Sequence, residues 1–204
     1  MTVYFHSEDI PGDIEWGNCV AVDTETQGLS LVRDRLCLVQ ISAGDGDAHI
    51  VQPNPNNFDC PRLKAVLADP NCEKIFHYAR FDIAVIKRDL NVEITSLFCT
   101  KIASKLVRTY TDRHGLKEVA REIAGVELSK QQQSSDWAAN ELTKAQLNYA
   151  ASDVLHLHVI KSRLTEMLKR EHRLELARKC FDFLPVRANL DLAGWSETDI
   201  FSHS

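Results

Sequence analysis

The stretch Val20–Leu29 reads Val-Ala-Val-Asp-Thr-Glu-Thr-Gln-Gly-Leu, and the rest of the chain is interpreted around it. Its apolar start predicts a buried β-strand that delivers Asp23 and Glu25 at its end. Residues two apart in a strand share a face, so both carboxylates point the same way. Carboxylates held this close repel unless protons or cations intervene, and hard divalent cations prefer oxygen ligands. The stretch therefore predicts a metal site.

The length of 204 residues suits one domain with a substantial core and is too short for two comfortable ones. We expect a single domain over 1–204, with a core at about 18–170 and a C-terminal helix and tail at about 171–204. A content of 44% hydrophobic and 26% charged residues is ordinary for a globular protein, so disorder over most of the chain is not expected.

The formal net charge of −5 argues against a protein that grips long nucleic acid through a generally basic surface. It leaves room for a short polyanionic substrate that is held locally. The segment Lys101–Arg121 contains six Lys or Arg residues against Asp112 and Glu118, a local charge of +4. This segment is either a phosphate-facing surface or a solvated helix face.

The six cysteines form no C-x-x-C pair and show no zinc-ligand spacing, which fits reduced thiols in a cytoplasmic protein. The first residues lack the positive and apolar regions of a secretory signal, and no run of about 18 apolar residues occurs. We therefore expect a cytoplasmic protein without a membrane partner.

The first half of the chain predicts strands joined by short links. Val20–Thr24 is the first central strand, and Leu36–Ser42 and Ala48–Gln52 follow it, with a tight turn at Gly44–Gly46 between the last two. Short links make such a meander antiparallel. Val3–Phe5 predicts an edge strand or an arm that precedes the core. The expected class is α/β, with a mixed central sheet that contains an antiparallel meander and is flanked by helices.

The second half predicts helices from its three- and four-residue apolar spacing. The polar run Ser129–Asp136 interrupts them and is interpreted as a binding loop. Outside that loop we expect a helix over Leu63–Leu67, a short strand over Lys74–His77, and helices over Ala79–Leu90, Lys101–Thr109, Leu116–Ala124 (ended by Gly125), Thr143 to about Lys169, and Leu174–Phe183 before Pro185.

Two further acids can join Asp23 and Glu25. Asp82 lies near the start of a helix that follows the short strand, and Asp153 shares a helix face with Tyr149 through their four-residue spacing. Each acid alone has an ordinary explanation, such as a strand-end turn or a favourable helix N-terminal charge. The ordered set with its apolar flanks favours one site instead.

This set resembles a known pattern. Asp23-x-Glu25, His77-x-x-x-Phe81-Asp82 and Tyr149-x-x-x-Asp153 are similar to the three motifs of the DEDD superfamily of 3′–5′ exonucleases. The histidine subclass would place its histidine five residues before the last acid, where this chain has Asn148. The chain thus resembles the tyrosine subclass, and the resemblance implies a ribonuclease H-like fold.

The resemblance extends to about residues 18–170. The run from Lys130 to Trp137 resembles a Lys/Trp segment of the ribonuclease D branch, and Cys99-Thr100-Lys101 resembles its Asp-Thr-containing helix. The departure is Cys99, where an Asp is common. The compact length, the 111–117 run and the 194–201 tail look like the nano-RNase C (NrnC) type of oligoribonuclease, which implies a ring-like homo-octamer acting on short RNA, diribonucleotides especially.

The resemblance implies roles for individual residues. Asp23, Glu25, Asp82 and Asp153 would hold two Mg²⁺ or Mn²⁺ ions, and Tyr149 would orient the attacking water or help to deprotonate it. Leu29 would separate the last two bases, or be a core residue, and His77 would contact the scissile phosphate or terminal nucleotide, or be structural. The weaker candidates for substrate binding are Thr24, Lys130, Gln133 and Trp137, and for Trp137 a core position is favoured.

Other functions remain open from the sequence. The nearest is a broader ribonuclease D-like 3′–5′ exonuclease acting on RNA or single-stranded DNA. An inactive RNA-binding scaffold would be expected to lack one of the acids, and all four are present. A metal-dependent hydrolase of another substrate is the third alternative.

Overall fold

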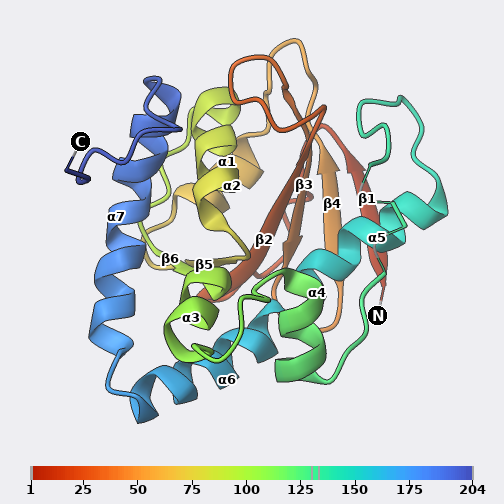
Figure 1. Cartoon of the computed structure of the whole chain (residues 1–204). Coiled ribbons are helices and arrows are strands. Elements are labelled where there is room, and N and C mark those ends of the chain that lie inside the picture. Colours follow the sequence, from red (N-terminus) through yellow and green to blue (C-terminus); the bar gives the residue numbers. More distant parts are fainter. Residues whose placement is uncertain (1, 130, 133, 204) are drawn as a thin grey trace.

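The centre of the molecule is a six-stranded mixed sheet with strand order β1-β4-β3-β2-β5-β6 (Figure 1). The computed structural model describes residues 2–129, 131–132 and 134–203. The antiparallel pairs β2–β3 and β3–β4 confirm the predicted meander, while β1 is parallel to β4, and β2, β5 and β6 are parallel to one another. The strands are β1 Val3–Ser7, β2 Cys19–Thr26, β3 Leu36–Ser42, β4 Ala48–Gln52, β5 Glu73–Phe76 and β6 Leu97–Cys99.

The predicted strands lie where the sequence placed them, with one omission. The bounds of β3 and β4 agree with the prediction, and β1 is an edge strand as expected. Strand β6 was not predicted, because three residues are too few to show a two-residue period. It lies at the other edge of the sheet, beside β5.

The helices also follow the predicted segments, with differences at their ends. Helices α2 and α4 each continue into a short π-helical turn, and the second of these turns ends at Gly125, whose φ of 74° suits glycine. The helices are α1 Pro61–Ala68, α2 Ala79–Val85, η1 Ile86–Leu90, α3 Thr100–Val107, α4 Leu116–Val119, η2 Ala120–Ala124, α5 Lys144–Leu155, α6 Leu157–Arg170 and α7 Leu174–Leu192.

The prediction of one helix from Thr143 to Lys169 is wrong in one respect. The predicted capping box is present, since the Thr143 and Gln146 side chains each bond the other's backbone N–H. However, the helix breaks at His156, whose φ of −105° and ψ of −5° depart from helical values. The break lets α5 cross the β2–β4 side of the sheet while α6 turns toward β5.

The prediction that the last helix ends before Pro185 is also wrong. Helix α7 runs through Pro185 to Leu192 and packs along α2 and β6. Proline removes one backbone hydrogen bond from a helix, and packing on one face can offset that loss. None of the helices in the described part of the chain combines the length and the apolar character needed to cross a membrane.

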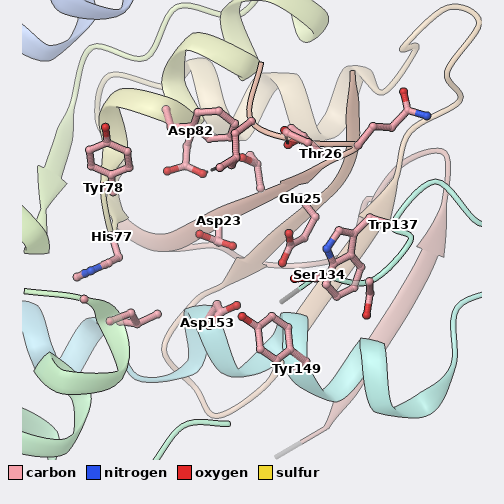
Figure 2. Close-up of a pocket in the computed structure, with 18 of the residues that line it drawn as sticks. Asp23, Glu25, Thr26, His77, Tyr78, Asp82, Ser134, Trp137, Tyr149 and Asp153 are labelled. Carbon is pink, nitrogen blue, oxygen red and sulfur yellow. Dashed lines mark hydrogen bonds between the residues drawn. The ribbon is translucent and has the colours of Figure 1, made fainter. Parts of the chain in front are cut away.

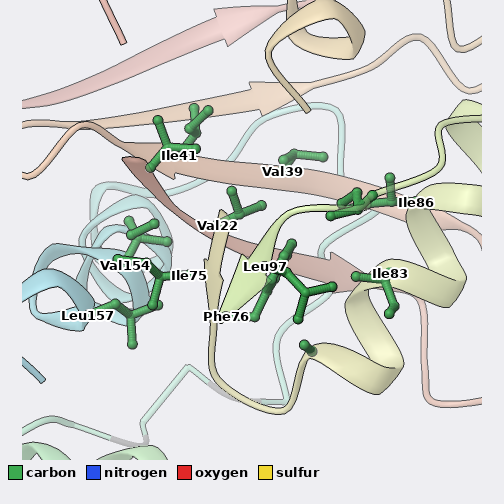
Figure 3. Packing of buried hydrophobic residues seen from close by; sticks show 14 of the residues in the cluster. Val22, Val39, Ile41, Ile75, Phe76, Ile83, Ile86, Leu97, Val154 and Leu157 are labelled. Atoms are coloured by element: carbon green, nitrogen blue, oxygen red, sulfur yellow. The ribbon is translucent and has the colours of Figure 1, made fainter. Parts of the chain in front are cut away.

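The core lies on both sides of the sheet, and all seven residues of β3 are buried. Figure 3 shows Val154 and Leu157 beside Ile75 on one side of the sheet, and Ile83 and Ile86 on the other. A strand covered on both faces reads as a continuous apolar run, which explains the sequence Leu-Cys-Leu-Val-Gln-Ile-Ser. The rigid sheet fixes the direction of the side chains at the end of β2.

Candidate active site

Three carboxylates converge where the second half of β2 faces α5 (Figure 2). Asp23 and Glu25 come from β2 and share its face, and Asp153 comes from α5. One carboxylate oxygen from each residue lies within 4.8 Å of one from the other two. The structure therefore brings together, around one point, acids that are about 130 residues apart in the sequence.

Asp82 borders the same group from helix α2. It is buried, and its Oδ1 accepts a hydrogen bond of 2.7 Å from the hydroxyl of Thr24. Thr24 lies between the two strand acids and points to the opposite face of β2, as strand alternation requires. The hydrogen bond from Thr24 therefore holds the Asp82 carboxylate beside β2.

The register of α5 explains why Tyr149 and Asp153 both face this point. Ala150, Ala151 and Val154 are fully buried against the sheet, and the two alanines allow a close approach of the helix. The four-residue spacing then places the phenol and the carboxylate on one face, as predicted. Both line the same cleft.

The cleft has a volume of about 680 Å³. Of the residues predicted as functional, its walls include Asp23, Thr24, Glu25, Leu29, His77, Asp82, Trp137, Tyr149 and Asp153. Sequence reasoning did not name several other lining residues as site residues, although Phe81, Lys101 and Ser134 fall in segments that it singled out: Thr26, Gln27, Tyr78, Phe81, Lys101 and Ser134.

The pKa values of all four acids are raised, as expected for carboxylates that have no cation as a partner. Burial, with the charges of the other acids, raises the pKa of Asp23 well above its usual value. Burial and then Asp153 and Asp82 raise the pKa of Glu25 to about 9, and burial foremost raises those of Asp82 and Asp153 to about 7. No ion pair within the described residues involves any of the four. An all-oxygen donor set of this kind fits divalent cations such as Mg²⁺ or Mn²⁺.

Tyr149 is half-buried beside these acids. Burial, and then the charges of Asp153, Glu25 and Asp23, raise the pKa of its phenol well above the usual value. The phenol therefore keeps its proton at physiological pH and can donate a hydrogen bond. Trp137 is 3% exposed, as the core interpretation predicted, yet it lines the cleft with its ring centroid 6.0 Å from that of Tyr149.

Leu29 and His77 differ in how far the structure supports their predicted roles. Leu29 is 84% exposed, so its interpretation as a core residue is wrong. His77 is held through Nδ1, which lies 2.9 Å from the Thr100 hydroxyl, and burial foremost lowers the pKa of its imidazole to about 3. A neutral imidazole carries no positive charge for a phosphate. The contact of His77 with the substrate stays a prediction.

Two predicted substrate residues, Lys130 and Gln133, lie outside the described residues. Their loop neighbours Ser134 and Ser135 line the cleft. The described part of the polar run 129–136 thus borders the site, as expected for a binding loop.

The sequence matches the family model described as "3′–5′ exonuclease" over residues 4–169. The chain is also 34% identical over 177 residues to ribonuclease D of Gluconacetobacter diazotrophicus, an alignment that covers 83% of this chain and 43% of that protein. This chain therefore spans less than half the length of the curated relatives it matches.

Solved structures of NrnC from Brucella melitensis are similar over the full length of both chains. The form bound to pGG has a TM-score of 0.97 with 53% sequence identity, and the form with bound Mg²⁺ has a TM-score of 0.95 with 51% identity. In both, 100% of each chain is covered. The expected ribonuclease H-like fold, shared with the tyrosine-type exonucleases, is confirmed.

Proposed function

The chain belongs to the family of 3′–5′ exonucleases, and we propose that it is a metal-dependent exoribonuclease acting on short oligoribonucleotides, diribonucleotides especially. It would release 5′-mononucleotides from the 3′ end. The observation that carries this proposal is the convergence of Asp23, Glu25 and Asp153, with the buried Asp82 and Tyr149 lining the same cleft. The full-length similarity to an NrnC bound to pGG supports the short substrate.

The metal part of the proposal assigns two Mg²⁺ or Mn²⁺ ions to Asp23, Glu25, Asp82 and Asp153. When bound, such ions would supply the positive charge that activates a water molecule and stabilises the leaving 3′-oxygen. The similarity to an NrnC with bound Mg²⁺ and the raised carboxylate pKa values support this assignment. Cations would offset the mutual repulsion of the acids, which no Lys or Arg of the described residues does.

The protein's own groups have distinct roles in this scheme. Thr24 keeps Asp82 in place through its hydrogen bond. The protonated phenol of Tyr149 donates to the attacking water and so orients it toward the phosphorus, because the phenol's raised pKa makes it a poor base. Trp137 lies beside Tyr149 in the wall of the cleft.

The preference for short RNA is supported by the size and charge of the molecule. A cleft of about 680 Å³ has the size of a small-molecule site, and the net charge of −5 provides no extended basic track. A long strand would therefore gain little beyond the nucleotides inside the cleft. Specificity would be expressed in kcat/KM, which should fall with substrate length.

The decisive experiment is a time course with a 5′-labelled diribonucleotide, with and without EDTA. Hydrolysis to mononucleotides that stops with EDTA and returns with excess Mg²⁺ or Mn²⁺ is the expected result. Rates on labelled RNAs of two to about twenty nucleotides then measure the length preference. Equal rates at all lengths would favour the broader ribonuclease D-like exonuclease, an alternative that the similarity to ribonuclease D supports. Metal-independent RNA binding without hydrolysis would favour the scaffold.

We also propose that the protein assembles as a homo-oligomer, with the ring-like octamer as the specific expectation. The support is four exposed apolar side chains on the last helix and the tail, of which Phe183 and Phe201 have ring centroids 5.8 Å apart: Phe183, Val186, Ile200 and Phe201. Apolar clusters of this kind mark protein contacts. Light scattering coupled to size-exclusion chromatography measures the mass, and a monomeric mass would refute the proposal.

A further inference from the structure

The loop 27–35, which joins β2 to β3, carries Leu29 at the edge of the cleft, and we call it the β2–β3 loop. Its ends lie close together, because the N–H of Gln27 donates a hydrogen bond of 3.1 Å to the Arg35 carbonyl. Gln27, Gly28 and Leu29 all line the cleft. Compact loops with adjoining ends are frequently functional. The position of this loop therefore sets one wall of the cleft.

The side chain of Leu29 is not held by packing. It is 84% exposed, and Val32 of the same loop is 97% exposed. A side chain with so few neighbours takes its position from its backbone. An apolar group that binds a base must be in place before the substrate arrives, since ordering it during binding costs affinity. The backbone of the β2–β3 loop therefore has to be fixed by contacts other than those of Leu29.

Arg88, in the turn η1, supplies such contacts. Its guanidinium group donates hydrogen bonds of 2.5 Å to the Leu31 carbonyl and of 2.9 Å to the Asp34 carbonyl. Two further bonds of 2.6 Å to the Asp89 carboxylate fix the orientation of the guanidinium group. Hydrogen bonds from a charged donor are strong, and the planar fork of arginine serves two carbonyls at once. Arg88 thus binds the loop at two points beyond Leu29.

Asp34 connects these points to the segment around Leu29. Its Oδ2 accepts a hydrogen bond of 2.9 Å from the N–H of Ser30, and its own N–H donates one of 2.9 Å to the Ser30 carbonyl. On the other side of Leu29, a Cβ added to Gly28 would overlap Asp34 Oδ2. Glycine allows this close approach of the chain. Both neighbours of Leu29 are therefore in contact with a residue that Arg88 holds.

We propose that Arg88 is a positioning residue for substrate binding, which fixes the β2–β3 loop so that Leu29 is in place against the bases of the substrate. The proposal rests on the proposed function and deepens it. Arg88 is not among the residues that line the described cleft, so it acts on the substrate through the loop. Because the Leu29 side chain is apolar, its contact is with bases and not with phosphates. A substrate that lacks the 3′ base should therefore be insensitive to Arg88.

The test compares pGG with an analogue whose 3′ nucleoside lacks its base. Arg88→Lys keeps the charge and removes the fork, and should raise the KM for pGG about 3- to 10-fold at a nearly constant kcat, the cost of ordering a loosened loop on binding. The KM for the analogue should stay within about twofold of the wild-type value.

Arg33→Lys is the matched control for this substitution. Arg33 belongs to the same loop and its side chain is 79% exposed. Within the described residues its guanidinium group donates to the Asp34 carboxylate and to no backbone carbonyl. The KM values for both substrates should therefore stay at those of wild type. An equal rise in KM for pGG in the two arginine variants would overturn the inference.

Two further variants test whether the effect passes through Leu29. Leu29→Ala combined with Arg88→Lys should have the KM of Leu29→Ala alone for pGG, because the positioned group is gone. Gly28→Ala displaces the loop from Asp34 while Arg88 is intact, and should raise the KM for pGG but not for the analogue. Additive effects in the double variant would overturn the inference. So would equal changes on both substrates, or a lower kcat at unchanged KM, the result of a purely structural role.

Hydrogen exchange separates this inference from the proposed function, because it needs no substrate. Deuterium uptake over 27–35 should be faster in Arg88→Lys than in wild type and unchanged in Arg33→Lys. Equal uptake in Arg88→Lys and wild type would overturn the inference. Should wild-type protein neither bind nor hydrolyse pGG, the proposed function fails, while deuterium uptake still decides whether Arg88 holds the loop.

Discussion

Helix α2 borders two buried groups of charges that differ in how they are neutralised. Toward α7, Arg80 makes hydrogen bonds of 2.6 and 2.8 Å to Asp191, which also pairs with Arg187 at 2.8 Å. Two residues along, Asp82 lines the cleft near Asp23 and forms no ion pair with any Lys, Arg or His of the described residues. The first acid has two arginines, and the second shares its environment with other acids.

The difference teaches which charges serve stability and which serve chemistry. Arg80 and Arg187 also donate hydrogen bonds to backbone carbonyls of Trp195 and Ser196. The cluster of Asp191, Arg80 and Arg187 therefore holds the start of the tail against α2 and α7. The cleft acids repel one another, although Asp82 is joined to β2 by its hydrogen bond from Thr24. Arginines of the protein neutralise the one cluster, whereas the repulsion within the other is relieved by protons or by a bound cation.

The largest expected effect is on catalysis. Asp153→Asn removes one carboxylate charge at constant shape and should lower kcat by about 10³-fold or more, because cation-held charge stabilisation provides several kcal/mol. Its melting temperature in EDTA should equal or exceed that of wild type, because a repulsive charge is gone. Asp23→Ala should likewise abolish hydrolysis. Activity measured on labelled diribonucleotide checks both, and an active purified variant would refute the assignment.

The opposite pattern is expected at the other cluster. Asp191→Ala leaves two guanidinium groups without their partner and should reduce the free energy of unfolding by about 3 kcal/mol, the low end for a buried pair because Arg80 is a third exposed. Urea unfolding measures the loss. Asp182→Ala, an exposed acid of the same helix, is the control and should change stability by less than about 0.5 kcal/mol. Equal losses in the two variants would erase the contrast between the clusters.

The pH dependence of stability should distinguish protein with and without metal. The cleft acids have folded-state pKa values above their unfolded ones, about 7 for Asp82 and Asp153 and about 9 for Glu25. The folded state then binds more protons than the unfolded state between about pH 4 and pH 9, so stability in EDTA should fall as pH rises through that window. Added Mg²⁺ should raise the melting temperature most near pH 9 and least near pH 5. A pH-independent response to Mg²⁺ would contradict the assignment of these acids as ligands.

The smallest expected effect is at the rim of the cleft. Leu29→Ala should change the free energy of unfolding by less than about 0.5 kcal/mol, since Leu29 is 84% exposed. If Leu29 separates the two bases of the substrate, the KM for diribonucleotide should rise several-fold while stability is unchanged. Parallel melting and kinetic measurements check this, and a stability loss above 1 kcal/mol would return Leu29 to a packing role.

Much of the fold was predictable because its central strands carry strong local patterns. The bounds of β3 and β4 and the capping box at Thr143 agree with the sequence prediction. Strand β6 was missed because three residues show no period, and the helix break at His156 was missed because apolar spacing continues through it. Helix α7 passes Pro185 because its packing on α2 outweighs one lost hydrogen bond.

The candidate site was only partly accessible from sequence. The acids and Tyr149 were found because their spacings are local and ordered, and the structure places all of them at the cleft. In the sequence Leu29 looks like any core leucine, so only its exposure in the structure separates the two interpretations. Lys101 and Tyr78 carry no motif that distinguishes them from a solvated helix face and a surface aromatic. The single-domain boundaries stay a prediction.

By itself the sequence determined the strand Val20–Thr24, which lies within β2, and the common face of Asp23 and Glu25, because a two-residue period is a property of the backbone. It also determined that Tyr149 and Asp153 share a helix face, for the corresponding reason. The tertiary structure decided which of the buried charges are neutralised and which are left for a ligand. That outcome depends on distances between segments far apart in the chain, which no local pattern records.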